Sequence, residues 1–225
     1  MQQENIGESS RVYFRRSDII SALVIGEAIA WLLYVMVKVN APELPIPADV
    51  AEGLAAFSTA LIMAFAFPLL SLAGMYAAYF VGKKIKSIYE AAKFALVGAL
   101  NTFVDLGVLN LLILLTSITA GSTFSVFKGL SFIIAVLNSY VWNKFWTFKS
   151  KKKSPEEIRK EFIQFFFVSV IGFFVNVATA SFVVNMIGPQ FGMAAEPWAN
   201  IGALAGTFTV FIWNFIGYKF WVFKR

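Results

Sequence analysis

The sequence predicts an all-α polytopic membrane protein with six transmembrane helices, the last four of which form two parallel-repeat hairpins. Three observations support this fold class. Of the 225 residues, 59% are hydrophobic and only 14% are charged, well outside the range of soluble domains. Six apolar stretches are each long enough to cross a hydrocarbon core, which takes about 20 residues. Finally, the chain twice carries the same aromatic and basic ending, at 143–149 and 218–224.

The predicted spans alternate with polar or basic connections along the chain. Arg15 and Arg16 precede the first span, but its apolar core is too long for a signal peptide and no small-residue cleavage site follows. We therefore expect this span to be a retained helix. The six spans are 19–39, 54–81, 94–115, 124–148, 162–187 and 198–223.

These spans suggest three domains. Residues 1–82 hold the N-terminal tail and an additional transmembrane hairpin, and residues 83–93 form a basic interfacial connector. Residues 94–225 form a four-helix domain. In the lead-in to the fifth span, Ser154, Pro155 and Glu157 have the spacing of a capping box with proline in the first turn, which predicts a helix start there.

The basic residues predict the orientation. All Lys and Arg residues except Lys38 and Lys128 lie at span ends on one side. The positive-inside rule places that side, and with it both termini, in the cytoplasm, and we expect a plasma (cytoplasmic or inner) membrane. Anionic headgroups account for the net charge of +6, so we expect no nucleic-acid partner. Because the chain has no His and no Cys, we also expect no metal and no cofactor.

The last four spans contain an internal duplication. Phe94 aligns with Phe165 and Asp105 with Asn176, while Asn143 aligns with Tyr218. The two registers differ by a few residues, which fall in the external loops, where length changes are tolerated best. The repeats cover 94–150 and 162–225. Both begin and end on the same side, so we expect them to be related by an axis along the membrane normal.

The repeated motifs resemble those of the GtrA-like family of small four-helix membrane proteins. The resemblance covers about residues 90–225 and leaves the hairpin at 1–82 outside it. It implies a role in moving polyprenyl-phosphate-linked monosaccharides from the cytoplasmic to the outer leaflet for cell-surface polysaccharide synthesis, or in assisting the enzymes that make or use them. The matching residues are Gly98, Asn101, Asp105, Asn143, Lys144, Trp146, Phe148, Asn214, Lys219, Trp221 and Phe223.

Asp105 is the most informative single residue, because its helix places it roughly 18 Å from the cytoplasmic interface. A carboxylate at that depth costs about 2.5–3.5 kcal/mol and requires a partner or a polar cavity. Lys128 is the candidate partner, and it shares helical spacing with Ser131 and Asn138. We predict a substrate pathway lined by Asn101, Asp105, Lys128, Ser131 and Asn138. The alternative is a structural ion pair that sets helix register.

A second set of residues is a candidate lipid-phosphate and headgroup site at the cytoplasmic rim. Topology, interfacial anchoring and interhelical hydrogen bonds are the alternative explanations for these residues. The set consists of Asn143, Lys144, Trp146, Lys149, Asn214, Lys219, Trp221 and Lys224. Separately, Glu27 in the first span is a possible proton or ion site.

The leading functional hypothesis is a non-enzymatic translocase whose partners are a polyprenyl-phosphate-linked sugar and anionic lipids. One alternative is an adaptor that anchors a membrane glycosyltransferase. A further alternative is a proton-coupled small-molecule transporter. Four core helices are few for a lipid path, so a homodimer is an additional hypothesis.

Overall fold

The computed structural model describes residues 12–40, 47–118, 121–150, 154–192 and 195–224. Over these residues the structure is all-helical and contains no strand, which confirms the predicted all-α class. The chain forms two compact units, Met1–Thr147 and Phe148–Arg225, which are described separately. The first unit therefore joins the additional hairpin to the first repeat, and the second unit holds the second repeat.

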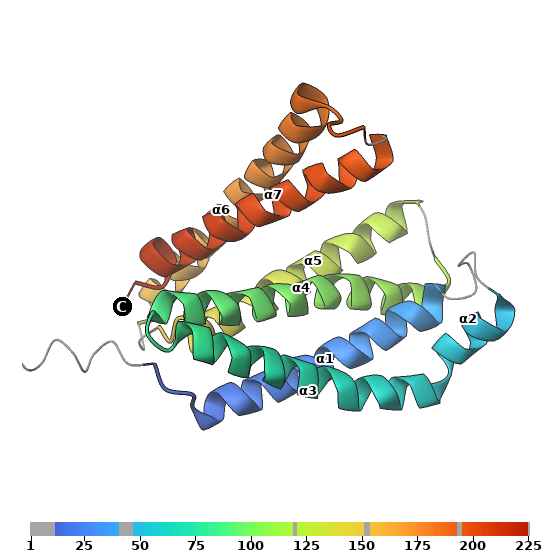
Figure 1. The fold of residues 1–225 in the computed structure, drawn as a ribbon, viewed down its shortest axis with the longest axis horizontal. Coiled ribbons are helices and arrows are strands. Elements are labelled where there is room, and N and C mark those ends of the chain that lie inside the picture. The colour runs from blue at the N-terminus through green and yellow to red at the C-terminus, as the bar shows by residue number, and fades with distance from the viewer. Residues whose placement is uncertain (1–11, 41–46, 119–120, 151–153, 193–194, 225) are drawn as a thin grey trace, which may run out of the picture. The chain divides into compact units, whose positions relative to one another are not determined.

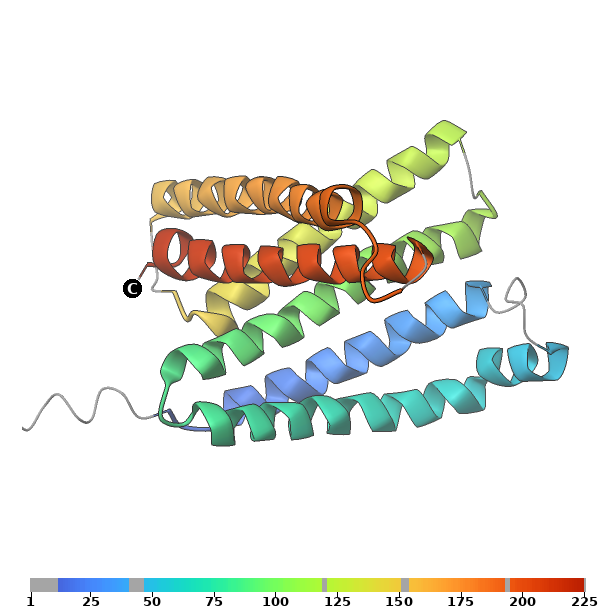
Figure 2. The same cartoon turned by 45° about the horizontal axis from the view of Figure 1, so that its top comes forward.

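The first unit is a bundle of four long helices and two short ones. Helix α1 packs against α3 and α4, and α5 packs against α4 (Figure 1). The start of α1, the turn between α3 and α4 and the end of α5 lie at the same end of this unit (Figure 2). The elements are α1 (Arg16–Asn40), α2 (Ala48–Ala55), α3 (Phe57–Gly82), α4 (Lys86–Thr116), α5 (Gly121–Trp142) and the π-helix η2 (Asn143–Thr147).

The second unit is a helical hairpin made by α6 (Pro155–Ser181) and α7 (Ala195–Gly217). The π-helices η3 (Phe182–Ile187) and η4 (Tyr218–Val222) continue the two helices. The predicted capping box is confirmed at the start of α6. The amide of Glu157 donates to Ser154 Oγ at 3.3 Å, and the amide of Ser154 donates to Glu157 Oε2 at 2.8 Å.

The two aromatic endings share an uncommon backbone. Both η2 and η4 are π-helical, and their first residues, Asn143 and Tyr218, are the residues that align in the sequence. Their last residues, Thr147 and Val222, align in the same way. Because π-helices are rare, the same short segment in both copies is structural support for the duplication.

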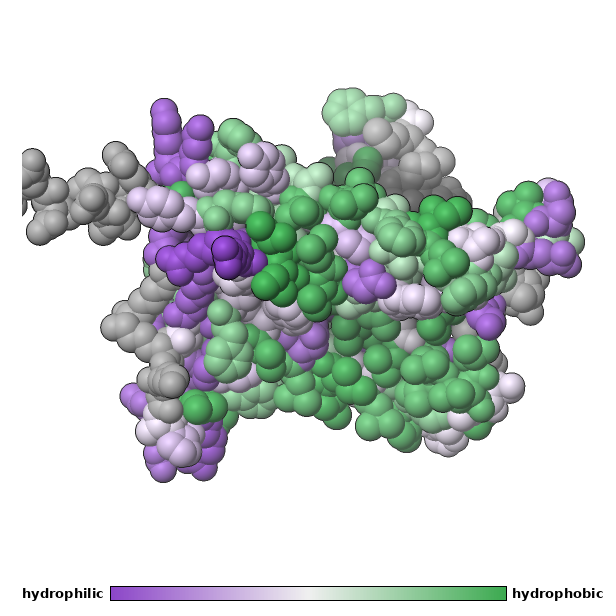
Figure 3. All heavy atoms as spheres, turned by 90° about the horizontal axis from the view of Figure 1, so that it is seen from below, coloured by the Kyte–Doolittle hydropathy of each residue, from purple (hydrophilic) through white to green (hydrophobic). Residues whose placement is uncertain are grey.

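Four helices in the described part of the chain are long and apolar enough to cross a membrane. They correspond to the first, second, third and fifth predicted spans, while α5 and α7 cover the fourth and sixth. The six-span count and the side on which the termini lie remain predictions. Apolar side chains cover much of the middle of the face on which α1 and α3 lie, and hydrophilic ones gather toward its ends (Figure 3).

The predicted connector 83–93 does not form a separate element over its second half. Helix α4 begins at Lys86 and continues without interruption to Thr116. Lys93, which the sequence places in the basic cytoplasmic rim, is consequently an interior residue of a long helix and is buried.

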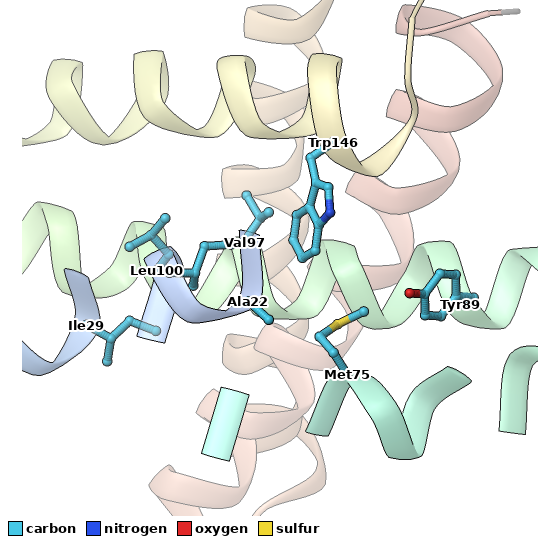
Figure 4. Close-up of a cluster of buried hydrophobic side chains, with 8 residues drawn as sticks. Ala22, Ile29, Met75, Tyr89, Val97, Leu100 and Trp146 are labelled. Carbon is cyan, nitrogen blue, oxygen red and sulfur yellow. The ribbon is translucent and has the colours of Figure 1, made fainter. Parts of the chain in front are cut away.

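The additional hairpin shares a core with the first repeat. Ala22 and Ile29 of α1 and Met75 of α3 pack with Val97 and Leu100 of α4 (Figure 4). Close contact with α4 depends on a glycine, since a Cβ at Gly107 would lie 2.6 Å from Leu32 Cδ2. The hairpin is therefore an integral part of this unit rather than a loosely attached addition.

Candidate functional site

Two polar side-chain pairs join α4 to α5. Ser131 Oγ donates to Asp105 Oδ1 at 2.7 Å. Asn138 Nδ2 donates to Asn101 Oδ1 at 2.6 Å. Ser131 is fully buried and the other three are partly buried. The structure thus brings together four of the five residues that the sequence predicts for the substrate pathway.

The pairs lie where the helical spacing places them. Asn101 and Asp105 are one turn apart on α4, so they face the same side, about 6 Å apart along the axis. Ser131 and Asn138 are two turns apart on α5, which puts them on one face as well. The predicted partner of Asp105, Lys128, belongs to α5, but its side chain lies outside the described residues.

The arrangement can bind polar groups inside the bundle. A carboxylate only accepts hydrogen bonds, a hydroxyl both donates and accepts, and a carboxamide does each with a different atom. A hydroxyl-bearing ligand can therefore exchange with either pair without leaving a buried polar group unsatisfied.

Each aromatic ending holds a lysine between two aromatic rings. Lys144 Nζ lies 5.2 Å from the ring centroid of Tyr140 and 5.9 Å from that of Phe145, and it donates to the Tyr140 hydroxyl at 2.9 Å. Lys219 Nζ lies 5.3 Å from Phe215 and 5.4 Å from Phe220. These rings hold ammonium groups through cation–π attraction. Two of the four lysines predicted for the phosphate site, Lys144 and Lys219, thus lie beside aromatic rings at aligned positions.

The first residue of η2 carries a buried acceptor. Asn143 is fully buried, and its Nδ2 donates to Ser139 O at 2.9 Å. Its Oδ1 and the Oγ1 of Thr147 have no hydrogen-bond partner among the described residues. Buried polar atoms usually have a partner, so these two atoms retain hydrogen-bonding capacity that a water or a ligand group can use.

The equivalent residue of η4 is satisfied. The Tyr218 hydroxyl lies 2.6 Å from Ser169 Oγ, and its ring stacks on Phe165 with centroids 4.5 Å apart. The capacity to bind an additional polar group at this position is therefore confined to the first copy.

The structure adds a buried charge cluster that the sequence analysis does not identify. Lys93 forms an ion pair with Asp18, and Trp146 Nε1 donates to the same carboxylate oxygen at 3.0 Å. From the sequence alone, Asp18 is explained as an acidic residue that stabilises the N-terminus of α1, and Lys93 as a cation at the membrane surface. Only the packing of α1 against α4 and η2 brings them together.

The tryptophans of the two endings differ. Trp146 is 4% exposed, and its ring points into the core toward α1 and α4 (Figure 4). Trp221 is 46% exposed, as an interfacial anchor is expected to be.

The remaining predicted residues are spread over both units. Lys149 is partly buried with a left-handed backbone, and Lys224 is exposed. Asn214 Oδ1 is buried without a hydrogen-bond partner among the described residues, close to Gly172. Glu27 Oε1 accepts a hydrogen bond of 2.7 Å from Trp31 Nε1, one turn along α1.

Comparison with known proteins agrees with the location of these motifs. The GtrA/DPMS transmembrane domain family matches residues 93–223, so the chain is a membrane protein that belongs to this family. It is 30% identical over 141 residues to the uncharacterized membrane protein YngA of Bacillus subtilis (strain 168). That alignment covers 63% of this chain and 82% of the relative. No solved structure matches the chain.

Proposed function

We propose that this protein is a translocase that moves a polyprenyl-phosphate-linked monosaccharide from the cytoplasmic to the outer leaflet of the plasma membrane. The observation that carries the proposal is the pair of polar contacts between α4 and α5, Asp105 with Ser131 and Asn138 with Asn101. They lie in the region that matches the GtrA/DPMS family.

The energetic problem in this reaction is the sugar headgroup. Its hydroxyls lose hydrogen bonds to water on entering hydrocarbon, and each unmatched hydroxyl costs several kcal/mol, about 4–8 in the most apolar reference solvents. The α4–α5 pairs supply acceptors and donors within the bundle that replace those bonds. The polyprenyl tail stays in lipid, where it has no such cost.

The phosphate needs a cationic site at the membrane surface. Lys144 is our candidate for this role: it belongs to η2, which directly follows α5, and its ammonium group, although buried, lies close to the rings of Tyr140 and Phe145. The buried Oδ1 of Asn143 beside it can accept a hydrogen bond from a sugar hydroxyl. Capture at η2 and passage along α4–α5 then form one route through the first repeat. No covalent step is involved, so the protein acts without being an enzyme.

The test is leaflet transfer of a labelled polyprenyl-phosphate sugar by purified protein in proteoliposomes. We expect Asp105→Asn and Asn138→Ala to reduce transfer at least tenfold, because each removes part of a polar pair. Asn176→Ala changes the aligned residue of the second repeat and is the matched control, with transfer close to that of the wild type.

Equal loss in all three variants would contradict a pathway in the first repeat. No transfer above that of empty liposomes, with folded wild-type protein and several sugars, would contradict the translocase. The adaptor would then be the better proposal, and co-purification of a glycosyltransferase with the full chain would test it.

A further inference from the structure

The start of α1 places a carboxylate in a site built for an anion. Lys93 Nζ and Trp146 Nε1 both donate to Asp18 Oδ1, and the amide of Arg15 donates to Asp18 Oδ2 at 3.0 Å. Donors from α4, η2 and the residues just before α1 thus converge on one carboxylate. Lysine ammonium, indole N–H and backbone amide are also donors that bind phosphate oxygens.

The cation of this site is enclosed by aromatic rings. Lys93 Nζ lies 4.6 Å from the ring centroid of Tyr89 and 5.2 Å from that of Trp146, and the lysine is only 3% exposed. An ammonium group buried in this way is strongly unfavourable without a neighbouring anion. The site therefore has to hold an anion, either Asp18 or another one that takes its place.

The two sides of the ion pair come from different parts of the protein. Lys93 and Trp146 lie within the family region, residues 93–223, whereas Asp18 belongs to the additional hairpin. The family domain supplies the cation and the indole N–H, and the hairpin supplies the anion. Trp146 and Lys144, the lysine proposed to capture the lipid phosphate, both belong to η2.

We propose that Lys93 and Trp146 form a phosphate-binding site, which Asp18 occupies in the resting protein, and that an incoming phosphate group displaces Asp18. The proposal rests on the proposed function only for the source of that phosphate, a lipid headgroup rather than the free ion. The hairpin then acts as a built-in competitor for the ligand.

Asp18 is positioned to leave without unfolding the hairpin. It lies in the first turn of α1, where its own amide and that of Ile19 donate to Arg15 O just before the helix, at 2.8 and 3.3 Å, rather than to another residue of α1. Further along, α1 is held on α4 by Leu32 against Gly107 and by the hydrogen bond of 2.8 Å from Asn40 Nδ2 to Asn110 Oδ1. Opening the first turn alone therefore frees the site.

The first experiment measures binding to the full-length protein in nanodiscs of zwitterionic lipid, with inorganic phosphate and a short-chain prenyl phosphate as probes. We expect Asp18→Asn to bind prenyl phosphate at least tenfold more tightly than the wild type, since the competing charge is gone. Adding Lys93→Gln to that variant should abolish the gain. Asn40→Ala loosens α1 elsewhere and should bind like the wild type.

Three results would overturn the site: no gain in Asp18→Asn, a gain that survives Lys93→Gln, or an equal gain in Asn40→Ala. The two probes separate the possible sources. An equal gain for inorganic phosphate supports recognition of the phosphate group alone, and a gain restricted to prenyl phosphate supports a lipid ligand.

A second experiment uses the wild type and does not depend on the folding of a variant. Hydrogen exchange is followed by mass spectrometry with and without saturating prenyl phosphate. We expect faster exchange at residues 16–22 and unchanged exchange near Asn40. Unchanged or slower exchange at 16–22 with ligand bound would refute displacement of Asp18. Neither experiment measures transport. A negative result for the phosphate site can therefore be distinguished from a negative result in the transfer assay.

Discussion

The hairpins α4–α5 and α6–α7 carry the same sequence pattern but are held together by different contacts. Asp105 bonds to Ser131 in the first. The aligned residues of the second are Asn176 and Gly206, and a Cβ at Gly206 would lie 2.7 Å from Asn176 O. Equivalent positions therefore meet in both hairpins, through a hydrogen bond in one and through close backbone approach in the other.

The aromatic endings differ in a similar way. Trp146 is buried against Asp18 of the additional hairpin, whereas the aligned Trp221 is exposed. Lys93, the other partner of Asp18, aligns with Gln164. The duplicated scaffold is thus shared, while buried polar and charged groups are concentrated in the first copy. The second copy can therefore contribute mainly to helix packing, while the first copy provides the buried polar groups proposed to bind a ligand.

The largest difference in stability between the two copies is expected at Lys93. The substitution Lys93→Met leaves the Asp18 carboxylate buried without its cation, which should lower the free energy of unfolding by about 3–5 kcal/mol. The aligned change Gln164→Met should alter it by less than about 0.5 kcal/mol. Thermal or denaturant unfolding in detergent compares the two, and equal effects would mean that the first copy has no special dependence on its buried charge.

Substitutions of the two tryptophans should give the next largest difference in stability between the two copies. Trp146→Phe keeps most of the ring but removes the N–H that donates to Asp18, and a hydrogen bond to a charged group contributes about 1.5–3 kcal/mol. Trp221→Phe affects an exposed ring and should change stability little. The same unfolding measurement checks both variants. A loss at Trp221 as large as that at Trp146 would contradict their assignment to core and surface.

The glycine seam of the second hairpin can be tested by overpacking. Gly206→Val places side-chain atoms against the backbone of Asn176, with an expected loss of about 1–3 kcal/mol. Gly98→Ala is the control in the first hairpin, since a Cβ there meets nothing within 4 Å. Unfolding of the purified variants measures the difference, and an unchanged Gly206→Val protein would show that α6 and α7 do not need close approach.

The smallest expected effect concerns the helix starts. Helix α6 has the Ser154 capping box, whereas the N-cap residue of α4, Ile85, makes no side-chain capping hydrogen bond. Ser154→Ala should cost about 1 kcal/mol because the first turn loses an acceptor. The rate of amide hydrogen exchange in the first turn of α6 should increase in the same variant. Unaltered exchange there would mean that packing alone holds the start of this helix.

Several features of the candidate site could be predicted because they depend on residues close together in the chain. The polar faces of α4 and α5 follow from helical spacing, and both meet in the structure through Asp105 and Ser131. The capping box follows from three adjacent positions. The equivalent surroundings of Lys144 and Lys219 follow from the repeated motif, since the flanking aromatic residues recur at the same spacing.

Other features depend on partners distant in the sequence, so no local pattern could reveal them. The position of Lys93 at the end of a predicted span indicates a solvated lysine at the cytoplasmic surface, where lysines at span ends normally lie. Trp146 and Trp221 have nearly identical flanking residues, yet only Trp146 finds an acceptor, because only the first unit contains α1. The packing of the additional hairpin on α4 likewise joins residues that are far apart in the chain.

The sequence by itself determined the all-helical membrane class, the duplication, the family and the polar face of each helix in the first repeat. These properties reside in composition, helical periodicity and repeated motifs, which the chain carries before it folds. The tertiary structure decided which of two similar endings is buried, which carboxylate neutralises Lys93, and which hydroxyl bonds to Asp105. A buried charge or hydrogen-bonding group is stabilised only by the partner that packing places beside it, and that choice depends on the whole fold.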